Sequence, residues 1–127
     1  MKLQHVALVS RSEESAQRFY GDLLGLERTR SFHVSADLSK GLFDSELHFE
    51  ALTYLKGEMH FEIFLIGEGQ WTPPRFHHIG LEVEDLEGFL KRCREKDVQV
   101  MEVPKGNKTV TMIKDFDGNL FEIRQKA

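Results

Sequence analysis

The length, composition and charge of the chain restrict its class. It has 127 residues, enough for one domain, and 40% of them are hydrophobic, including ten Phe, so the chain can form a core and is not intrinsically disordered. Acidic residues outnumber basic ones by 21 to 17, and no basic stripe of the kind that binds nucleic acid is visible. Aliphatic-aromatic runs such as residues 63–66 are far shorter than the ~20 residues of a membrane span. A single cysteine, Cys93, cannot form an internal disulfide, so we expect a reducing, cytoplasmic location.

The chain contains an internal repeat, which is best identified before individual motifs. Residues 5–8 read His-Val-Ala-Leu and residues 78–81 read His-Ile-Gly-Leu, and the tripeptide Phe-Glu-Ile stands at both 61–63 and 121–123. The histidine and the glutamate are 57 positions apart in the first half and 44 in the second, so the first half holds 13 more residues between its helix and its last strand. The repeat predicts two modules with the same order of elements.

In the first half, a strand through residues 3–9 is followed by a helix. Apolar side chains at i, i+3, i+4, i+7 and i+8 form one helical stripe: Ala16, Phe19, Tyr20, Leu23 and Leu24. Ser10 or Ser12 can cap the start of this helix, and Gly25 stands where a helix commonly ends. Strand-like runs follow at residues 47–55 and 59–66. Residues 67–75, which include Trp71 and a Pro-Pro pair, have no periodicity and indicate a linker.

The second half repeats this order. A strand at residues 76–83 precedes a helix that Asp85 can cap, with a stripe at Leu86, Phe89, Leu90 and Cys93. Further strands are predicted at 98–103, 109–114 and 120–124, with turn signals at 105–108 and 117–119. We therefore predict an α+β fold of two tandem βαβββ modules in a single domain, residues 1–127. Module one is 1–66, the linker 67–75 and module two 76–127.

Alternation along the strands places one histidine and one glutamate of each module among apolar or small neighbours. His5 shares a face with Ala7 and Val9, and Glu62 shares a face with Phe64, while the more apolar opposite face should meet a helix. A solvated strand face accounts for a single polar residue without any function. The same residue types at matching positions of both modules favour a site instead. The four candidates are His5, Glu62, His78 and Glu122.

Two imidazoles and two carboxylates suit a divalent ion of borderline hardness, namely Ni, Zn, Co, Mn or Fe. A structural zinc site would normally use thiolates, and Cys93 lies on a helix stripe. Four protein ligands would leave two positions of an octahedral ion for water or substrate, which indicates catalysis or ligand capture. The sequence contains no Ser-His-Asp order, Gly-rich phosphate loop or CxxC pair that would favour another chemistry.

These residues resemble the vicinal oxygen chelate superfamily, which includes glyoxalase I, methylmalonyl-CoA epimerase, extradiol dioxygenases, and fosfomycin- and bleomycin-resistance proteins. The resemblance rests on residues 5–8, 19–26, 78–83 and 115–123, and it extends over essentially the whole chain. Phe116 stands where the family commonly has proline. The resemblance implies paired βαβββ modules that form a curved mixed sheet around a cleft with a metal on its floor.

Carried over position by position, the resemblance implies one divalent ion bound by His5, Glu62, His78 and Glu122. A glutamate at the fourth-strand position is similar to the arrangement of glyoxalase I and the epimerase. Dioxygenase and fosfomycin-type members do not need a ligand there, and metal-free antibiotic-binding members usually lack most of the ligands. The positions that help bacterial-type glyoxalase I to hold glutathione are Val9 and Ile66 in this sequence, so the resemblance does not extend to those contacts.

For function, the resemblance implies a metal-dependent lyase or isomerase of the glyoxalase I or epimerase type. It would transfer a proton next to a carbonyl of a small-molecule substrate through a metal-chelated enediolate, with Glu62, Glu122 or both as the base. His60, on the face of Glu62, can orient that carboxylate or touch substrate. Two alternatives stay open: an Fe(II) dioxygenase, and a non-catalytic small-molecule (antibiotic) binding protein. For members this short, the resemblance also implies a homodimer.

Overall fold

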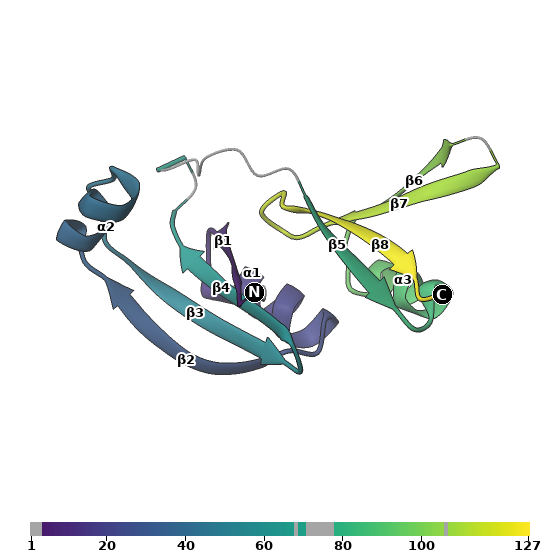
Figure 1. Ribbon diagram of the computed structural model, residues 1–127, viewed down its shortest axis with the longest axis horizontal. Helices are drawn as coiled ribbons and strands as arrows, with labels where there is room; N and C mark the ends of the chain where they lie inside the picture. The colour runs from purple at the N-terminus through teal and green to yellow at the C-terminus, as the bar shows by residue number, and fades with distance from the viewer. Residues whose placement is uncertain (1–3, 68, 71–77, 106) are drawn as a thin grey trace. The chain divides into compact units, whose positions relative to one another are not determined.

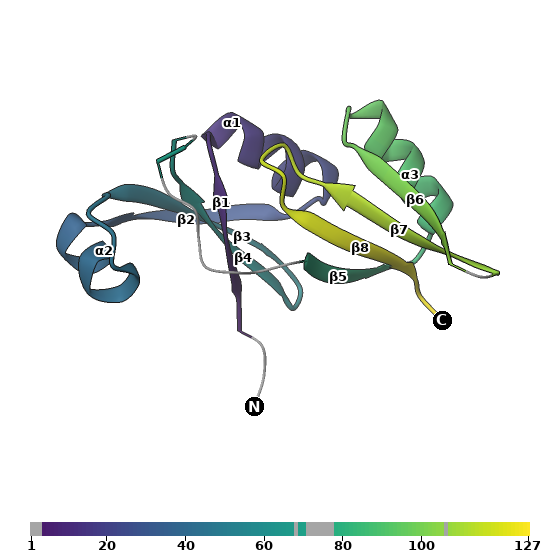
Figure 2. The same cartoon turned by 90° about the horizontal axis from the view of Figure 1, so that it is seen from above.

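The computed structural model describes residues 4–67, 69–70, 78–105 and 107–127. The chain divides into two compact units, residues 1–73 and 74–127, and each is described by itself. In its described part, each unit contains a four-stranded mixed sheet (Figures 1 and 2). Most of the predicted linker (residues 68 and 71–75) and Phe76 of the predicted fifth strand lie outside the described residues. None of the helices in the described ranges is long and apolar enough to cross a membrane.

Unit 1 is a βαβββ module with one additional helix. Its elements are β1 (Val6–Ser10), α1 (Glu13–Ala16), η1 (Gln17–Leu23), β2 (Glu27–Val34), α2 (Ala36–Phe43), β3 (Phe49–Lys56) and β4 (Met59–Leu65). The strand order is β1-β4-β3-β2, with β1 parallel to β4 and the other pairs antiparallel. The additional helix, α2, lies within the longer segment predicted for the first half.

The first helix begins at one of its two predicted caps. Ser12 Oγ accepts a hydrogen bond from the Ser15 amide at 3.1 Å. From Gln17 onward the helix widens into the π-helical stretch η1, where the Leu24 amide donates to the Phe19 carbonyl at 3.0 Å, five residues back. Gly25, with a φ of +72°, follows the helix in a left-handed conformation that glycine adopts without strain, as its position predicted.

The more apolar face of β4 meets this helix, as the alternation predicted. Phe61 and Ile63 are buried there, and the ring of Tyr20 lies 5.5 Å from that of Phe61. The opposite face of β4 carries Glu62, so the first helix and the candidate glutamate lie on different sides of the sheet.

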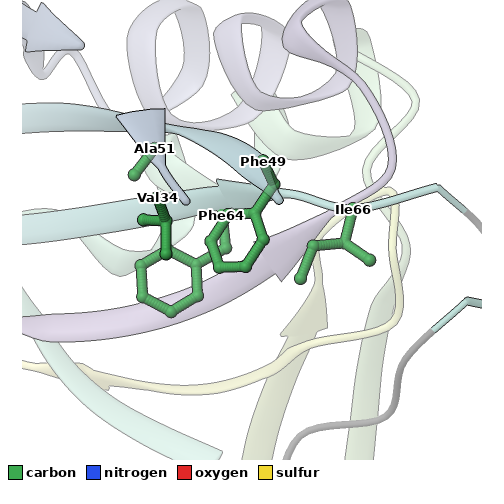
Figure 3. Packing of buried hydrophobic residues seen from close by; sticks show 5 residues of the cluster. All are labelled: Val34, Phe49, Ala51, Phe64 and Ile66. Carbon is green, nitrogen blue, oxygen red and sulfur yellow. The ribbon is translucent and has the colours of Figure 1, made fainter. Parts of the chain in front are cut away.

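The face that carries Glu62 becomes apolar toward the end of β4. Val34, Phe49, Ala51, Phe64 and Ile66 form a buried cluster on this side (Figure 3). Phe43, the last residue of α2, packs against the cluster with its ring 5.7 Å from that of Phe64. The extra segment of the first half therefore covers the apolar end of this face, and the polar end holds the candidate site residues.

Unit 2 has the elements β5 (His78–Val83), α3 (Leu86–Glu95), β6 (Val100–Lys105), β7 (Lys108–Lys114) and β8 (Leu120–Gln125). The strand order β5-β8-β7-β6 repeats that of unit 1, again with the first strand parallel to the last. Asp85 caps α3 as predicted, because its carboxylate accepts from the Gly88 amide at 3.1 Å. The predicted α+β fold of two βαβββ modules is confirmed.

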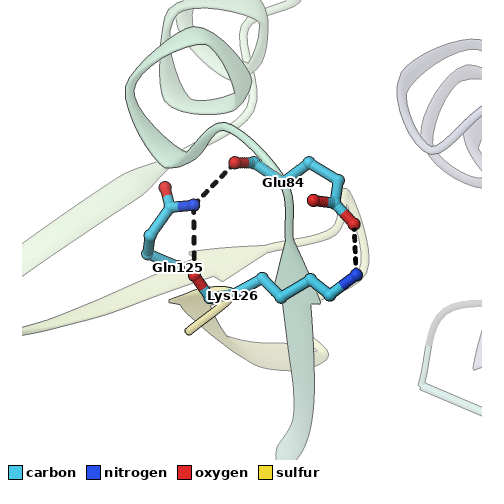
Figure 4. A network of polar contacts seen from close by, with 3 residues as sticks. All are labelled: Glu84, Gln125 and Lys126. Atoms are coloured by element: carbon cyan, nitrogen blue, oxygen red, sulfur yellow. Dashed lines mark hydrogen bonds and ion pairs between the residues drawn. The ribbon is translucent and has the colours of Figure 1, made fainter.

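Two polar networks fix the ends of β8. Before the strand, the Asp115 carboxylate accepts from the amides of Asp117 and Asn119 at 3.0 and 2.8 Å. After it, the Gln125 side chain accepts from the Leu86 amide at 2.8 Å and donates to the Glu84 carbonyl at 2.6 Å (Figure 4). Both networks hold in place the strand that carries Glu122.

Candidate metal centre

His5 and Glu62 form the first of two histidine–glutamate pairs. Glu62 lies opposite Ala7 in the parallel β1–β4 register, and His5 precedes Ala7 by two residues, so both side chains lie on one face. His5 Nε2 and Glu62 Oε2 are 3.5 Å apart. The glutamate side chain is 16% exposed and the histidine 39%, so this pair is open to solvent mainly at the imidazole.

His78 and Glu122 form the second pair with the same construction. Glu122 lies opposite Gly80 in the parallel β5–β8 register, and His78 precedes Gly80 by two residues. His78 Nε2 and Glu122 Oε2 are 3.6 Å apart, with side-chain exposures of 38% and 19%. The sequence repeat therefore extends to the register of the strands and to the spacing of the two polar side chains.

The donor chemistry of the first pair suits a cation. The Gln4 side-chain oxygen accepts from His5 Nδ1, which leaves the lone pair of Nε2 directed toward the Glu62 carboxylate. Two acceptors that face each other repel, and a cation between them removes the repulsion. Ligands bound to one ion at ~2.1 Å lie roughly 3.0–3.4 Å apart at octahedral to tetrahedral bond angles, close to the spacing within each pair.

Each unit supplies two candidate ligands. In the part of the chain that the structure describes, no group of three or more His, Cys, Asp or Glu side chains lies close enough to hold a metal ion. The structure thus brings His5 to Glu62 and His78 to Glu122. The four-ligand site stays a prediction.

The surroundings of the two glutamates differ. Thr53, on β3, lies directly opposite Glu62, and His60 lies on the same face with its ring 5.4 Å from that of His5. Among the described residues, His5 is the ion-pair partner of Glu62. The carboxylate of unit 1 therefore stands among polar side chains.

Glu122 is held by an arginine instead. Arg124 Nε and one of its terminal nitrogens lie 3.1 and 3.0 Å from Glu122 Oε1, while Oε2 faces His78. Met112 lies opposite Glu122 on β7, where unit 1 has Thr53, and Leu120 stands where unit 1 has His60. The sequence analysis missed Gln4, Thr53 and Arg124, because cross-strand register, which a single sequence does not fix, is what connects Thr53 to the pairs.

Two other groups lie apart from the pairs. His33 Nδ1 is 2.8 Å from Glu50 Oε1 on the β2–β3 ladder, and both side chains are about half exposed. His33 neighbours Phe32, which packs on the face of Glu62, so His33 points to the opposite side. Cys93 is fully buried in α3, and burial raises the pKa of its thiol to about 11, which suits the core position that its helix stripe predicted.

Comparisons with solved structures show the fold. The glyoxalase family protein from Enterococcus faecalis is 20% identical, with a TM-score of 0.72 over 96% of this chain and 95% of that one. The fosfomycin resistance protein FosX from Listeria monocytogenes is 15% identical, with a TM-score of 0.71 over 100% and 94% of the two chains. The trypanothione-dependent glyoxalase I of Leishmania major is 17% identical, with a TM-score of 0.72 over 98% and 86%. No curated protein matched the sequence.

A sequence family covers almost the whole chain. Residues 2–123 match the family described as the Glyoxalase/Bleomycin resistance protein/Dioxygenase superfamily. The match includes both Phe-Glu-Ile tripeptides and both histidines of the two pairs. The chain belongs to the Glyoxalase/Bleomycin resistance protein/Dioxygenase superfamily.

Proposed function

We propose that the protein is a metal-dependent enzyme that moves a proton at a carbon next to a carbonyl, as a lyase or isomerase of the glyoxalase I or epimerase type. The observation that carries this proposal is the duplicated histidine–glutamate pair, which has the same register and nearly the same N–O separation in both units. Structural neighbours support the metal, since FosX from Listeria monocytogenes was crystallised with Mn(II) and a dihydroxypropylphosphonic acid.

In the proposed site, His5, Glu62, His78 and Glu122 hold one divalent ion. When bound, the ion supplies Lewis-acid stabilisation of negative charge that develops on substrate oxygens. The two imidazoles act as neutral donors through Nε2, and Gln4 orients the first of them. Glu62 and Glu122 approach the substrate from different units and can accept or return the proton at its carbon. The presence of Glu62 supports the glyoxalase and epimerase branches over the dioxygenase branch.

Metal analysis tests the ligand set. We expect one Ni, Zn, Co, Mn or Fe ion per site, and His5→Ala or His78→Ala should abolish tight binding. His33→Ala is the matched control, since His33 also pairs with a glutamate, on the opposite face of unit 1. Stoichiometric metal in both histidine variants would contradict the ligand assignment. A metal-free protein that takes up no metal would favour the binding-protein alternative, and iron with oxygen consumption would favour the dioxygenase.

Solvent isotope exchange tests the chemistry. We would assay 2-hydroxy thioesters, thiohemiacetals and acyl-CoA epimers in deuterated water for incorporation at the carbon next to the carbonyl. Glu62→Gln and Glu122→Gln keep the size of the side chain and remove its basicity, so at least one of them should lose exchange while staying folded. Glu50→Gln, in the control pair, should keep it. Full exchange in both site variants would exclude the glutamates as bases.

The assembly can be tested separately. Each sheet has its first strand, β1 or β5, at one edge within the described residues, and open edges favour association. The proposal therefore includes a two-fold symmetric dimer, which light scattering would contradict by showing a stable metal-bound monomer. Mixing a His5→Ala chain with a His78→Ala chain should restore about one site per heterodimer if ligands are pooled between chains. The absence of recovery would place all four ligands in one chain.

A further inference from the structure

Two buried polar atoms near Glu62 lack a hydrogen-bond partner among the described residues. One is Thr53 Oγ1, in a residue that is only 2% exposed, and the other is His60 Nε2. Thr53 lies opposite Glu62 on the neighbouring strand, and His60 precedes Glu62 by two residues on the same face. A buried polar group without a partner destabilises the fold, so two of them beside one candidate ligand need an explanation.

The amide of Gln4 sets which nitrogen of His60 carries the proton. Gln4 Oε1 accepts from His5 Nδ1, which turns Gln4 Nε2, a donor, toward His60 Nδ1 at 3.4 Å. His60 Nδ1 is then the acceptor of a neutral imidazole, and its proton resides on Nε2. The unpartnered atom of His60 is therefore a hydrogen-bond donor, as is the hydroxyl of Thr53.

Unit 2 does not repeat this arrangement. Met112 lies opposite Glu122, where unit 1 has Thr53, and Leu120 takes the place of His60 two residues before the glutamate. Neither replacement can donate a strong hydrogen bond. The donors belong to unit 1 alone, so they are not a requirement of the shared backbone or of the histidine–glutamate pair.

We infer that His60 Nε2 and Thr53 Oγ1 form a donor subsite beside Glu62 that receives an acceptor oxygen of the substrate. The inference rests on the proposed function, and it assigns the side on which the carbonyl oxygen of the substrate lies. Two donors directed at this oxygen stabilise the negative charge that it gains as the proton leaves the neighbouring carbon. His60 and Thr53 contact substrate in this subsite, and Gln4 is a positioning residue that acts through His60.

The tautomer of His60 can be read without metal or substrate. Long-range ¹H–¹⁵N correlation spectra of the metal-free protein should show His60 protonated at Nε2 and His5 protonated at Nδ1. Gln4→Leu should remove this fixed pattern at both rings, and Gln4→Asn, which keeps an amide on a shorter chain, should restore it in part. A wild-type spectrum with His60 protonated at Nδ1 overturns the subsite.

Thr53→Val separates a ligand-binding role from a structural one. The change removes a hydroxyl that has no partner within the described fold, so Tm should not fall. The same variant should weaken binding of acetohydroxamate, a small chelator with two neighbouring oxygens, to the Zn(II)-loaded protein by about tenfold. His60→Phe should have an effect of the same size. The matched controls Thr111→Val, a buried threonine of β7, and His48→Phe, an exposed histidine, should leave this affinity unchanged.

The outcomes separate this inference from the proposed function. A fall in Tm for Thr53→Val shows that its hydroxyl is satisfied within the fold and overturns the subsite. Unchanged acetohydroxamate affinity in both Thr53→Val and His60→Phe, with Zn(II) still bound, overturns the subsite and leaves the metal site intact. Failure of the wild-type protein to bind Zn(II) overturns the proposed function and the subsite with it.

Discussion

The turn before β8 depends on one buried carboxylate, that of Asp115. Its side chain accepts three hydrogen bonds, from the amides of Asp117 and Asn119 at 3.0 and 2.8 Å and from the Asn119 side-chain nitrogen at 2.7 Å. Asp115 is 6% exposed. Because the turn leads directly into the strand of Glu122, removing the carboxylate should weaken both the fold of unit 2 and the candidate metal site.

The size of the effect follows from these three bonds. A hydrogen bond to a charged acceptor contributes ~1.5–3 kcal/mol. The donors on Asp117 and Asn119 are half-buried, so water can replace part of what they lose. We expect Asp115→Ala to lower the free energy of unfolding by about 2–4 kcal/mol, or Tm by roughly 10 °C. Asp115→Asn keeps one acceptor oxygen and should cost about half as much.

Urea unfolding followed by circular dichroism measures this change. The matched control is Glu84→Ala, an acidic residue of the same unit whose side chain is 81% exposed and pairs with Lys126 at 2.8 Å (Figure 4). An exposed pair of this kind contributes ~0–1 kcal/mol, so the control should stay close to wild type. If Asp115→Ala costs no more than the control, the backbone donors of the turn do not depend on the carboxylate.

Three further predictions concern stability. Ser12→Ala removes the cap of the first helix and should lower the free energy of unfolding by about 1 kcal/mol in urea titration. Gly25→Ala places a Cβ on a residue with a φ of +72° and should cost about 1–2 kcal/mol, with Gly41→Ala as the control at an unstrained position. Burial raises the pKa of Cys93 from 9.0 to about 11, so the unfolded chain loses this proton first. Stability should therefore fall as pH rises from about 9 to about 11, and Cys93→Ala should remove that part of the pH dependence in thermal unfolding.

Local sequence patterns predicted most of the elements because those elements have strong local signals. The stripes of the first helix and α3, the caps Ser12 and Asp85, and five of the later strands followed from periodicity and turn residues. The strand β2 was not predicted, because seven of its eight residues are partly or fully exposed and polar side chains dominate it. The helix α2 has two exposed leucines, Leu38 and Leu42, which blur its apolar stripe.

The candidate site was predicted in part for a similar reason. Alternation within a strand placed each histidine and glutamate on the correct face, and the repeat connected the two pairs. The neighbours of the carboxylates depend on strand register, which arises from the whole sheet. Thr53 lies nine residues before Glu62 in sequence, and a β3–β4 slip of one residue would turn it to the other face. Such neighbours become visible only with the structure.

The different neighbours imply different tasks for the two glutamates. Arg124 engages Glu122 Oε1 through two nitrogens, so rotation of that carboxylate breaks charge-assisted hydrogen bonds, and Oε2 stays directed at His78. Glu62 has no such restraint among the described residues, and the inferred donor subsite lies beside it. A carboxylate that must receive a proton from carbon and return it has to move, whereas a fixed ligand has to stay. We therefore expect Glu62→Gln to remove more solvent exchange than Glu122→Gln, and Arg124→Leu to narrow the difference by freeing Glu122. Equal loss in the two glutamine variants, unchanged by Arg124→Leu, would show that the arginine does not divide their roles.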